Sequence, residues 1–186
     1  MRAAANRICR LTLAFGLAAG LSAPAFAVGD ESDETSPPPK TETTTKCADG
    51  KVWDKKRKEC VAPKKSSFND DDLYEAAREF AYAGQYENAI TVLNLARNKN
   101  DPRILNYLGY ANRKAGRMEL GMSYYRKALQ ADENYILARS YMGQALAEEG
   151  DIQGARVQLV EIRDRGGENT WAYRALLQSL NGYRTY

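Results

Sequence analysis

The sequence contains no histidine, so it lacks the side chain that most often acts as a general base and binds transition metals. It also lacks a Gly-x-Ser-x-Gly elbow and a glycine-rich phosphate loop, two patterns typical of hydrolases and nucleotide-binding enzymes. Paired acids such as Glu148 and Glu149 precede a glycine, and we interpret them as solvated charges at a helix end. We therefore expect a protein that is not an enzyme and that needs neither a cofactor nor a metal. A hydrolase that depends on one specific acid is the third alternative.

Cysteine is also scarce: there are three, and Cys9 lies in a segment that we expect to be removed. The other two, Cys47 and Cys60, are close in sequence, and an even pair in an exported protein favours a disulfide. Closing this loop would remove about 3 kcal/mol of unfolded-chain entropy. Two cysteines without histidine cannot complete an ordinary zinc site.

Long apolar runs are missing except near the start of the chain, where residues 1–27 are typical of a signal peptide. Three arginines precede an apolar segment over 11–21 that is too short to span a membrane, and Ala25 to Ala27 form a small-x-small cleavage site. We expect the mature chain to begin near Val28, to be exported to the periplasm and to have no membrane span. An uncleaved anchor is the alternative.

Net charge gives no indication of nucleic-acid binding. The chain has 27 Lys and Arg against 24 Asp and Glu, and the leader holds three of the arginines and no acid, so the mature chain is neutral. Only the segment 47–65 is notably basic.

Two segments lack the apolar residues that a core needs. Residues 28–46 contain three consecutive prolines and many threonines, so we expect a disordered linker. Residues 61–69 form a second, shorter linker. It ends at Asn69, which we expect to cap the first helix of the folded domain.

The rest of the chain repeats a pattern about every 34 residues. Its clearest copy, 103–128, places small residues such as Gly109 and Gly121 among large apolar ones at helical spacing, with Gly116 at the turn. Leu-Gly in the first helix and Ala-x-x-x-aromatic in the second resemble the tetratricopeptide repeat. Where that family has a first-helix tryptophan, this chain has Leu73, Leu105 and Arg139.

This resemblance implies an all-α fold, a right-handed α-solenoid of three helix hairpins with a C-terminal capping helix. The hairpins are expected over about 70–101, 102–135 and 136–169, and the cap over 170–181. The individual helices are expected at 70–82, 86–98, 102–115, 119–131, 136–149, 152–165 and 170–181. No strand is predicted.

In tetratricopeptide arrays, the first helices of successive repeats line a concave groove that takes peptides. The resemblance places these residues in the groove: Tyr74, Arg78, Tyr82, Arg103, Asn106, Tyr110, Arg113, Lys114 and Gln144. An acidic or C-terminal segment would suit Arg78, Arg113 and Lys114 as charge anchors. The alternative is that these are ordinary exposed helix residues, with the tyrosines packed between helices.

The loop 47–60 has one large anchor, Trp53, followed by a basic run, and we expect a small stapled hairpin or loop. The basic residues are Lys55, Lys56, Arg57 and Lys58. The spacing is similar to part of the small chitin-binding modules of the peritrophin type, which implies a contact with polysaccharide or an anionic surface. Alternatively, Trp53 packs on the disulfide or the first repeat, and the basic residues are solvated.

The sequence therefore predicts an exported, non-enzymatic scaffold that binds a protein or peptide segment in its groove. The alternative function is a cell-envelope binding module that uses the Cys47–Cys60 loop, with the repeats as a spacer. Three repeats make a short array, so pairing with a second copy of the chain is a further alternative.

Overall fold

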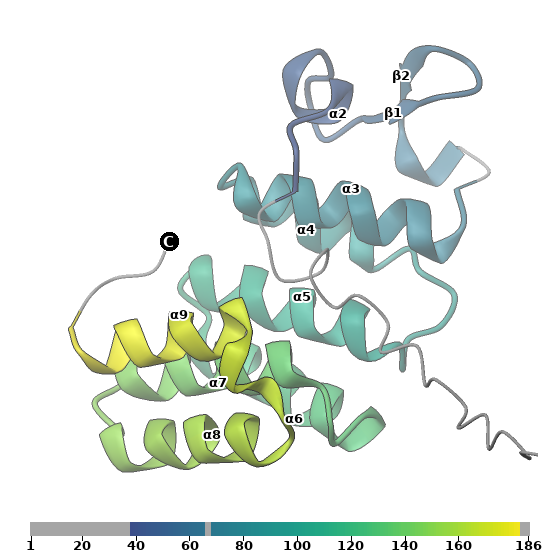
Figure 1. Cartoon of the computed structure of the whole chain (residues 1–186). Coiled ribbons are helices and arrows are strands. Elements are labelled where there is room, and N and C mark those ends of the chain that lie inside the picture. Colours follow the sequence, from purple (N-terminus) through teal and green to yellow (C-terminus); the bar gives the residue numbers. More distant parts are fainter. Residues whose placement is uncertain (1–37, 66–67, 183–186) are drawn as a thin grey trace, which may run out of the picture.

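The structure is a computed structural model that describes residues 38–65 and 68–182. The predicted signal peptide, the predicted linker up to residue 37 and the tail after Gly182 lie outside these residues. The described part is mostly helical, with eight α-helices and one two-stranded sheet (Figure 1). This confirms the expected helical class. The two short strands around Trp53 form the stapled hairpin that was expected within 47–60, whereas the expectation that no strand forms is wrong there.

The repeat region contains seven of these helices. They are α3 (Asp70–Tyr82), α4 (Tyr86–Leu93), α5 (Pro102–Lys114), α6 (Met118–Ala131), α7 (Ile136–Glu148), α8 (Ile152–Asp164) and α9 (Trp171–Leu180). A short 3-10 turn, η2 (Gly167–Asn169), precedes α9. All but α4 begin and end within one residue of the predicted bounds.

α4 ends at Leu93 instead of residue 98 because an aspartate competes for its last turn. The carboxylate of Asp70 accepts hydrogen bonds from the backbone N–H groups of Arg97 and Asn98, both at 2.8 Å. These bonds hold the chain after α4 against the start of α3 in a non-helical conformation, which a local helix pattern does not reveal.

Local signals fix several of the other helix ends. Asn69 caps α3 as predicted: its side chain accepts from the backbone N–H of Asp72 at 2.8 Å, and the Asp72 carboxylate accepts from the Asn69 N–H at 3.1 Å. The turn inside each hairpin has its glycine in the left-handed region, with φ of +75° at Gly84, +84° at Gly116 and +85° at Gly150.

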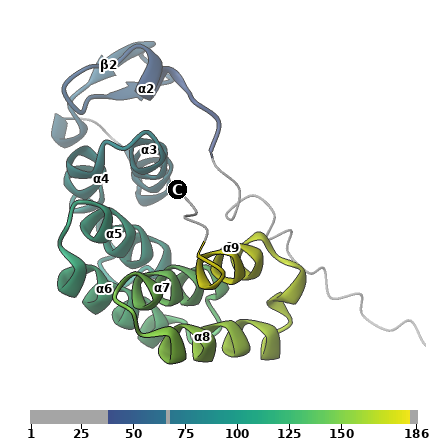
Figure 2. The same cartoon turned by 90° about the vertical axis from the view of Figure 1, so that its left-hand side faces the viewer.

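The hairpins α3/α4, α5/α6 and α7/α8 stack in chain order, and α9 packs against α7 and α8 (Figures 1 and 2). Figure 2 shows two layers, with α3, α5, α7 and α9 on the inner side of a curve and α4, α6 and α8 on its outer side. Successive inner helices contact one another directly. The inner layer is therefore closely packed, and this packing determines how much of the predicted groove is open.

Glycine lets α5 and α6 touch. A β-carbon at Gly109 would lie 2.6 Å from two ring carbons of Tyr125 and 3.2 Å from the carbonyl oxygen of Gly121. Both distances are shorter than a relaxed contact allows, and Tyr125 is fully buried. The expected close helix contact and the expected core position of Tyr125 are both confirmed.

Residues 41–61 form a small N-terminal module that lies on α3. It consists of one helical turn, α2 (Glu42–Thr45), and an antiparallel hairpin of β1 (Val52–Asp54) and β2 (Glu59–Val61). The Cys47–Cys60 disulfide closes the module, as predicted. A 3-10 turn, η1 (Pro63–Lys65), leads away from it.

The predicted linker 28–46 is wrong for its last six residues, because side chains of α3 hold them. Thr41 and Thr44 donate hydrogen bonds to the carboxylate of Glu79, and Thr43 is buried. Val52, only 3% exposed, joins the same hydrophobic core as α3. The module thus shares the core of the repeats, having none of its own.

Candidate functional site

The predicted groove residues lie on the inner helices, but most of them are buried. Tyr74, Arg78, Asn106, Tyr110, Arg113 and Gln144 are each at most 5% exposed. The half-buried members are Tyr82, Arg103 and Lys114. An open groove lined by all nine residues is therefore wrong, and the alternative that the tyrosines pack between helices is the better description.

A tyrosine cluster fills the inner layer. Rings from successive helices contact one another, with centroids 5.5 Å apart for Tyr74 and Tyr107 and 5.0 Å apart for Tyr110 and Tyr141. The hydroxyls of Tyr82 in α3 and Tyr141 in α7 lie 3.1 Å apart, which bridges the first and third hairpins across α5. Such aromatic contacts stabilise a fixed curvature of the stack.

Burial also keeps these phenols protonated. It raises the pKa of Tyr107 and Tyr141 well above the ordinary value, and it raises the pKa of Tyr125 to about 12. These three buried tyrosines are therefore neutral near neutral pH.

Two of the proposed charge anchors are used inside the array. The Nε of Arg78 donates to the Tyr107 hydroxyl at 3.2 Å. The Arg113 side chain is 1% exposed, and its Nη1 lies 3.3 Å from a carboxylate oxygen of Glu148. The prediction that both arginines stand exposed to capture an acidic ligand is wrong, because the close approach of α5 to its neighbours encloses them.

The amides are enclosed as well. Gln144 donates to the Ser140 hydroxyl at 3.2 Å, and Ser140 donates to the carbonyl of Ala172 at 2.7 Å. Asn106 is fully buried, and neither atom of its side-chain amide has a hydrogen-bond partner in the described part of the chain. In this conformation it cannot reach the backbone of a bound peptide.

Arg103 has a structural role at the start of α5. Its Nη2 lies 2.9 Å from Asp71 and 2.8 Å from Asp101, and its guanidinium carbon lies 5.0 Å from the ring centroid of Tyr74. It therefore ties the first hairpin to the second at the edge of the inner face.

A partly accessible surface remains around the pair Tyr110 and Tyr141, and we call it the inner aromatic patch. Tyr82 stacks on Tyr110, with ring centroids 6.2 Å apart, and the Lys114 ammonium lies 5.9 Å from the same ring. Trp171 meets Tyr141 edge to face at 6.4 Å. Tyr82, Lys114 and Trp171 are all half-buried, so the patch presents aromatic edges and one cation.

Sequence reasoning missed Trp171 as a candidate because it treated α9 only as a cap. The repeat frame that selects Arg103 in α5 also selects Trp171 in α9, two repeats later. Extending the frame into the cap would have found it.

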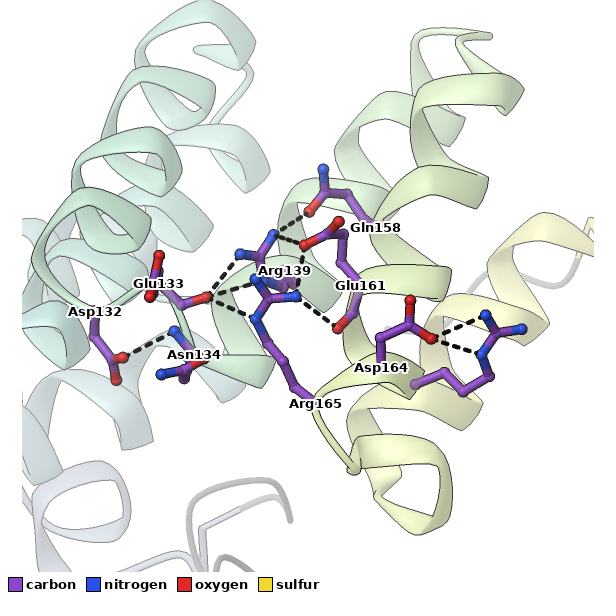
Figure 3. A network of polar contacts seen from close by, with 9 residues as sticks. Asp132, Glu133, Asn134, Arg139, Gln158, Glu161, Asp164 and Arg165 are labelled. Atoms are coloured by element: carbon purple, nitrogen blue, oxygen red, sulfur yellow. Dashed lines mark hydrogen bonds and ion pairs between the residues drawn. The ribbon is translucent and has the colours of Figure 1, made fainter.

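A polar network joins α7, α8 and the loop before α7, as Figure 3 shows. Arg139 donates to the carbonyl of Glu133 at 2.7 and 3.2 Å, and Arg165 donates to the same carbonyl at 3.1 Å. Both arginines also pair with the carboxylate of Glu161. Burial and the nearby Arg165 lower the pKa of Arg139. The charged groups of this network find their partners within it, so we interpret the network as a structural junction between hairpins.

A concave site lies between the N-terminal module and α3, and we call it the α3 cleft. It has a volume of about 450 Å³. Its apolar lining includes Val52, Trp53, Phe68 and Ala76, and its polar lining consists of five carboxylates, two lysines and two threonines. The volume is within the range of small-ligand and peptide side-chain pockets.

The basic run of the module lies at the turn between β1 and β2, where all four side chains are exposed. Asp54 fixes the turn by accepting from the N–H groups of Lys56 and Arg57, both at 2.9 Å. Trp53 is half-buried, and the ammonium of Lys46 lies 5.1 Å from its ring centroid. The structure thus brings Trp53, Lys55 and Lys56 to the α3 cleft, whereas Arg57 and Lys58 do not line it.

Two further features, a membrane-spanning helix and a cluster of metal-ligating side chains, are absent from residues 38–65 and 68–182. No helix there has the length and apolar character needed to cross a membrane. The same residues contain no group of three or more side chains placed to ligate a metal ion.

No protein-family model matches this chain, and its comparison with curated proteins gives no significant similarity.

Proposed function

We propose that this protein is an exported, non-enzymatic adaptor of tetratricopeptide-like hairpins that binds a segment of a partner protein on its inner face. The observation that supports this most is the inner aromatic patch. Rigid rings backed by a packed tyrosine cluster lose little conformational freedom on binding, and aromatic side chains are enriched at binding hot spots. We further propose that export ends in the periplasm, where the Cys47–Cys60 disulfide is stable.

The patch suggests the chemistry of the bound segment. Tyr82 and Trp171 offer amphipathic ring surface, which suits an aliphatic or aromatic side chain. Lys114 is the cation of the patch, so a neighbouring carboxylate on the partner would complete the contact. This is a smaller acidic-segment site than the groove that sequence reasoning predicted, because Arg78 and Arg113 are enclosed.

A position-specific crosslink tests the proposal. A photoreactive phenylalanine analogue replaces Tyr82 in the protein in cells, and a second version carries it at Arg126, which is exposed on α6 in the outer layer. We expect a discrete adduct from position 82, none of the same size from position 126, and loss of the adduct with Lys114→Glu. Identical adducts from both positions would overturn the proposal.

A second candidate function rests on the exposed basic turn between β1 and β2. Because the module is fastened to α3, this turn is held as a fixed positive projection, which suits docking to an anionic polymer or lipid surface of the envelope. Reversing Lys55, Lys56, Arg57 and Lys58 to glutamate should abolish salt-sensitive binding to envelope material while leaving the crosslink at position 82. Unchanged binding would exclude this second function.

A further inference from the structure

The α3 cleft is a built feature of the fold. One wall belongs to the N-terminal module and the other to α3, and buried contacts fix the two walls to each other. Glu79 of α3 accepts hydrogen bonds from Thr41 and Thr44, and Val52 is embedded in the core of the repeats. The cleft therefore keeps its shape without a ligand.

Its charge is uneven. Asp71, Asp72 and Glu75 stand exposed along the first turns of α3, and the carboxylates lining the cleft outnumber the lysines by five to two. The Asp71 and Glu75 side chains are 71% and 61% exposed. Each has one arginine partner, because Arg103 Nη2 lies 2.9 Å from Asp71 and Arg78 Nη1 lies 3.8 Å from Glu75. Both arginines are also shared with a second partner, Asp101 for Arg103 and the Tyr107 hydroxyl for Arg78. The cleft consequently favours a cationic occupant.

Its aromatic lining agrees with that charge. Trp53 and Phe68 are half-buried at the cleft, and tryptophan is the best aromatic partner for a cation. The ammonium of Lys46 already lies 5.1 Å from the Trp53 ring centroid. The buried Val52 and Ala76 provide an apolar floor for a small aliphatic side chain.

We propose that the α3 cleft binds an extended basic segment of a partner protein, with Lys or Arg side chains against the α3 acids and Trp53, and an aliphatic side chain over Val52 and Ala76. This surface is separate from the inner aromatic patch and prefers the opposite charge. One adaptor could then hold two different segments.

The two tryptophans allow each surface to be observed alone. In the Trp171→Phe protein, Trp53 is the only tryptophan and reports on the α3 cleft; in the Trp53→Phe protein, Trp171 reports on the inner aromatic patch. The probe is a blocked hexapeptide of alternating Leu and Arg, and its control is the same peptide with Glu in place of Arg.

With Trp171→Phe, we expect the basic peptide to change Trp53 emission saturably and the acidic peptide to leave it unchanged. Adding Glu75→Lys should weaken binding by about fivefold or more, because it removes one attraction and adds one repulsion. The matched reversal Glu119→Lys, exposed on α6 and absent from the cleft lining, should leave the affinity within twofold, because salt screens exposed charges that do not contact the ligand.

Three outcomes would overturn the proposal: equal binding of the two peptides, equal weakening by the two reversals, or a response of Trp171 without one of Trp53. The last would refute the α3 cleft while supporting the inner face. A response of Trp53 together with a failed crosslink at position 82 would support the α3 cleft and refute binding on the inner face.

Discussion

Thr41 and Glu79 are 38 residues apart in sequence, and two hydrogen bonds join them: the backbone N–H of Thr41 donates at 2.7 Å and its hydroxyl at 2.5 Å, one to each carboxylate oxygen. Thr44 adds its own backbone N–H at 3.1 Å. Glu79 is 5% exposed, so an acid buried on α3 is satisfied almost wholly by the N-terminal module. This contact turns a segment with linker composition into part of the fold.

Replacing Glu79 with alanine should release the module. Losing these charge-assisted hydrogen bonds should lower the free energy of local opening of residues 41–61 by about 3 kcal/mol. Hydrogen exchange at the Thr44 amide measures this, with far-ultraviolet circular dichroism to show that α3 to α9 persist. The control is Glu75→Ala, four residues earlier on an exposed position of α3. Slow exchange retained in Glu79→Ala would show that the disulfide and Val52 alone hold the module.

Arg113→Glu should destabilise the whole array. It places a carboxylate where the Arg113 side chain is 1% exposed, beside Glu148, and an uncompensated buried charge costs about 3 kcal/mol or more. Urea unfolding should show a lower midpoint with an unchanged slope. Arg113→Met should cost less, because methionine fills the space without a charge. A folded Arg113→Glu protein of normal stability would restore the interpretation of Arg113 as an exposed ligand anchor.

Gly109→Ala should weaken the α5–α6 contact. The added carbon would lie 2.6 Å from the Tyr125 ring, and such overpacking typically costs about 1–3 kcal/mol. Thermal unfolding of the variant should show a lower melting temperature. In a double-mutant cycle with Tyr125→Leu, part of the cost should disappear because the ring no longer occupies that space. Strictly additive effects would contradict the contact.

Asn106→Leu should stabilise the protein. The change removes two buried polar atoms that have no partner in the described residues, and an unmet amide of this kind costs about 1–3 kcal/mol. The matched control is Asn112→Leu, because Asn112 is equally buried but donates to the carbonyl of Leu108 at 2.8 Å and accepts from Arg117 at 2.7 Å. Denaturant unfolding should therefore move in opposite directions for the two variants. Destabilisation by both would show that Asn106 is satisfied.

Acid should free the segment after α4. Hydrogen bonds from the backbone N–H groups of Arg97 and Asn98 lower the pKa of Asp70 from its ordinary value of 3.8. A carboxyl group with a depressed folded pKa stabilises the fold above about pH 3.8 and loses that contribution as the pH falls through the lower folded value. The protection factor of the Arg97 amide, which compares its observed exchange rate with the intrinsic rate at the same pH, should fall on acidification below pH 4, and Asp70→Asn should abolish this dependence. An unchanged Arg97 amide would show that other bonds hold the segment.

The sequence determined the parts of this protein that depend on neighbours within one or two helical turns. Asn69 before three aspartates is enough to begin α3, and glycines with positive φ end the first helix of each hairpin. The spacing of Gly109 and Gly121 is enough to predict that α5 and α6 touch. The disulfide follows from two cysteines that lie close together.

Tertiary structure alone decided which side chains are accessible. The frame placed Arg113 and Asn106 on α5, a helix of the inner layer, but the curvature of the stack, with contacts such as that between Tyr82 and Tyr141, determined that both are enclosed. Likewise, no local pattern shows that Thr41 has a partner on α3. Burial depends on how distant helices approach one another, and a pattern that repeats along one helix carries no information about that distance.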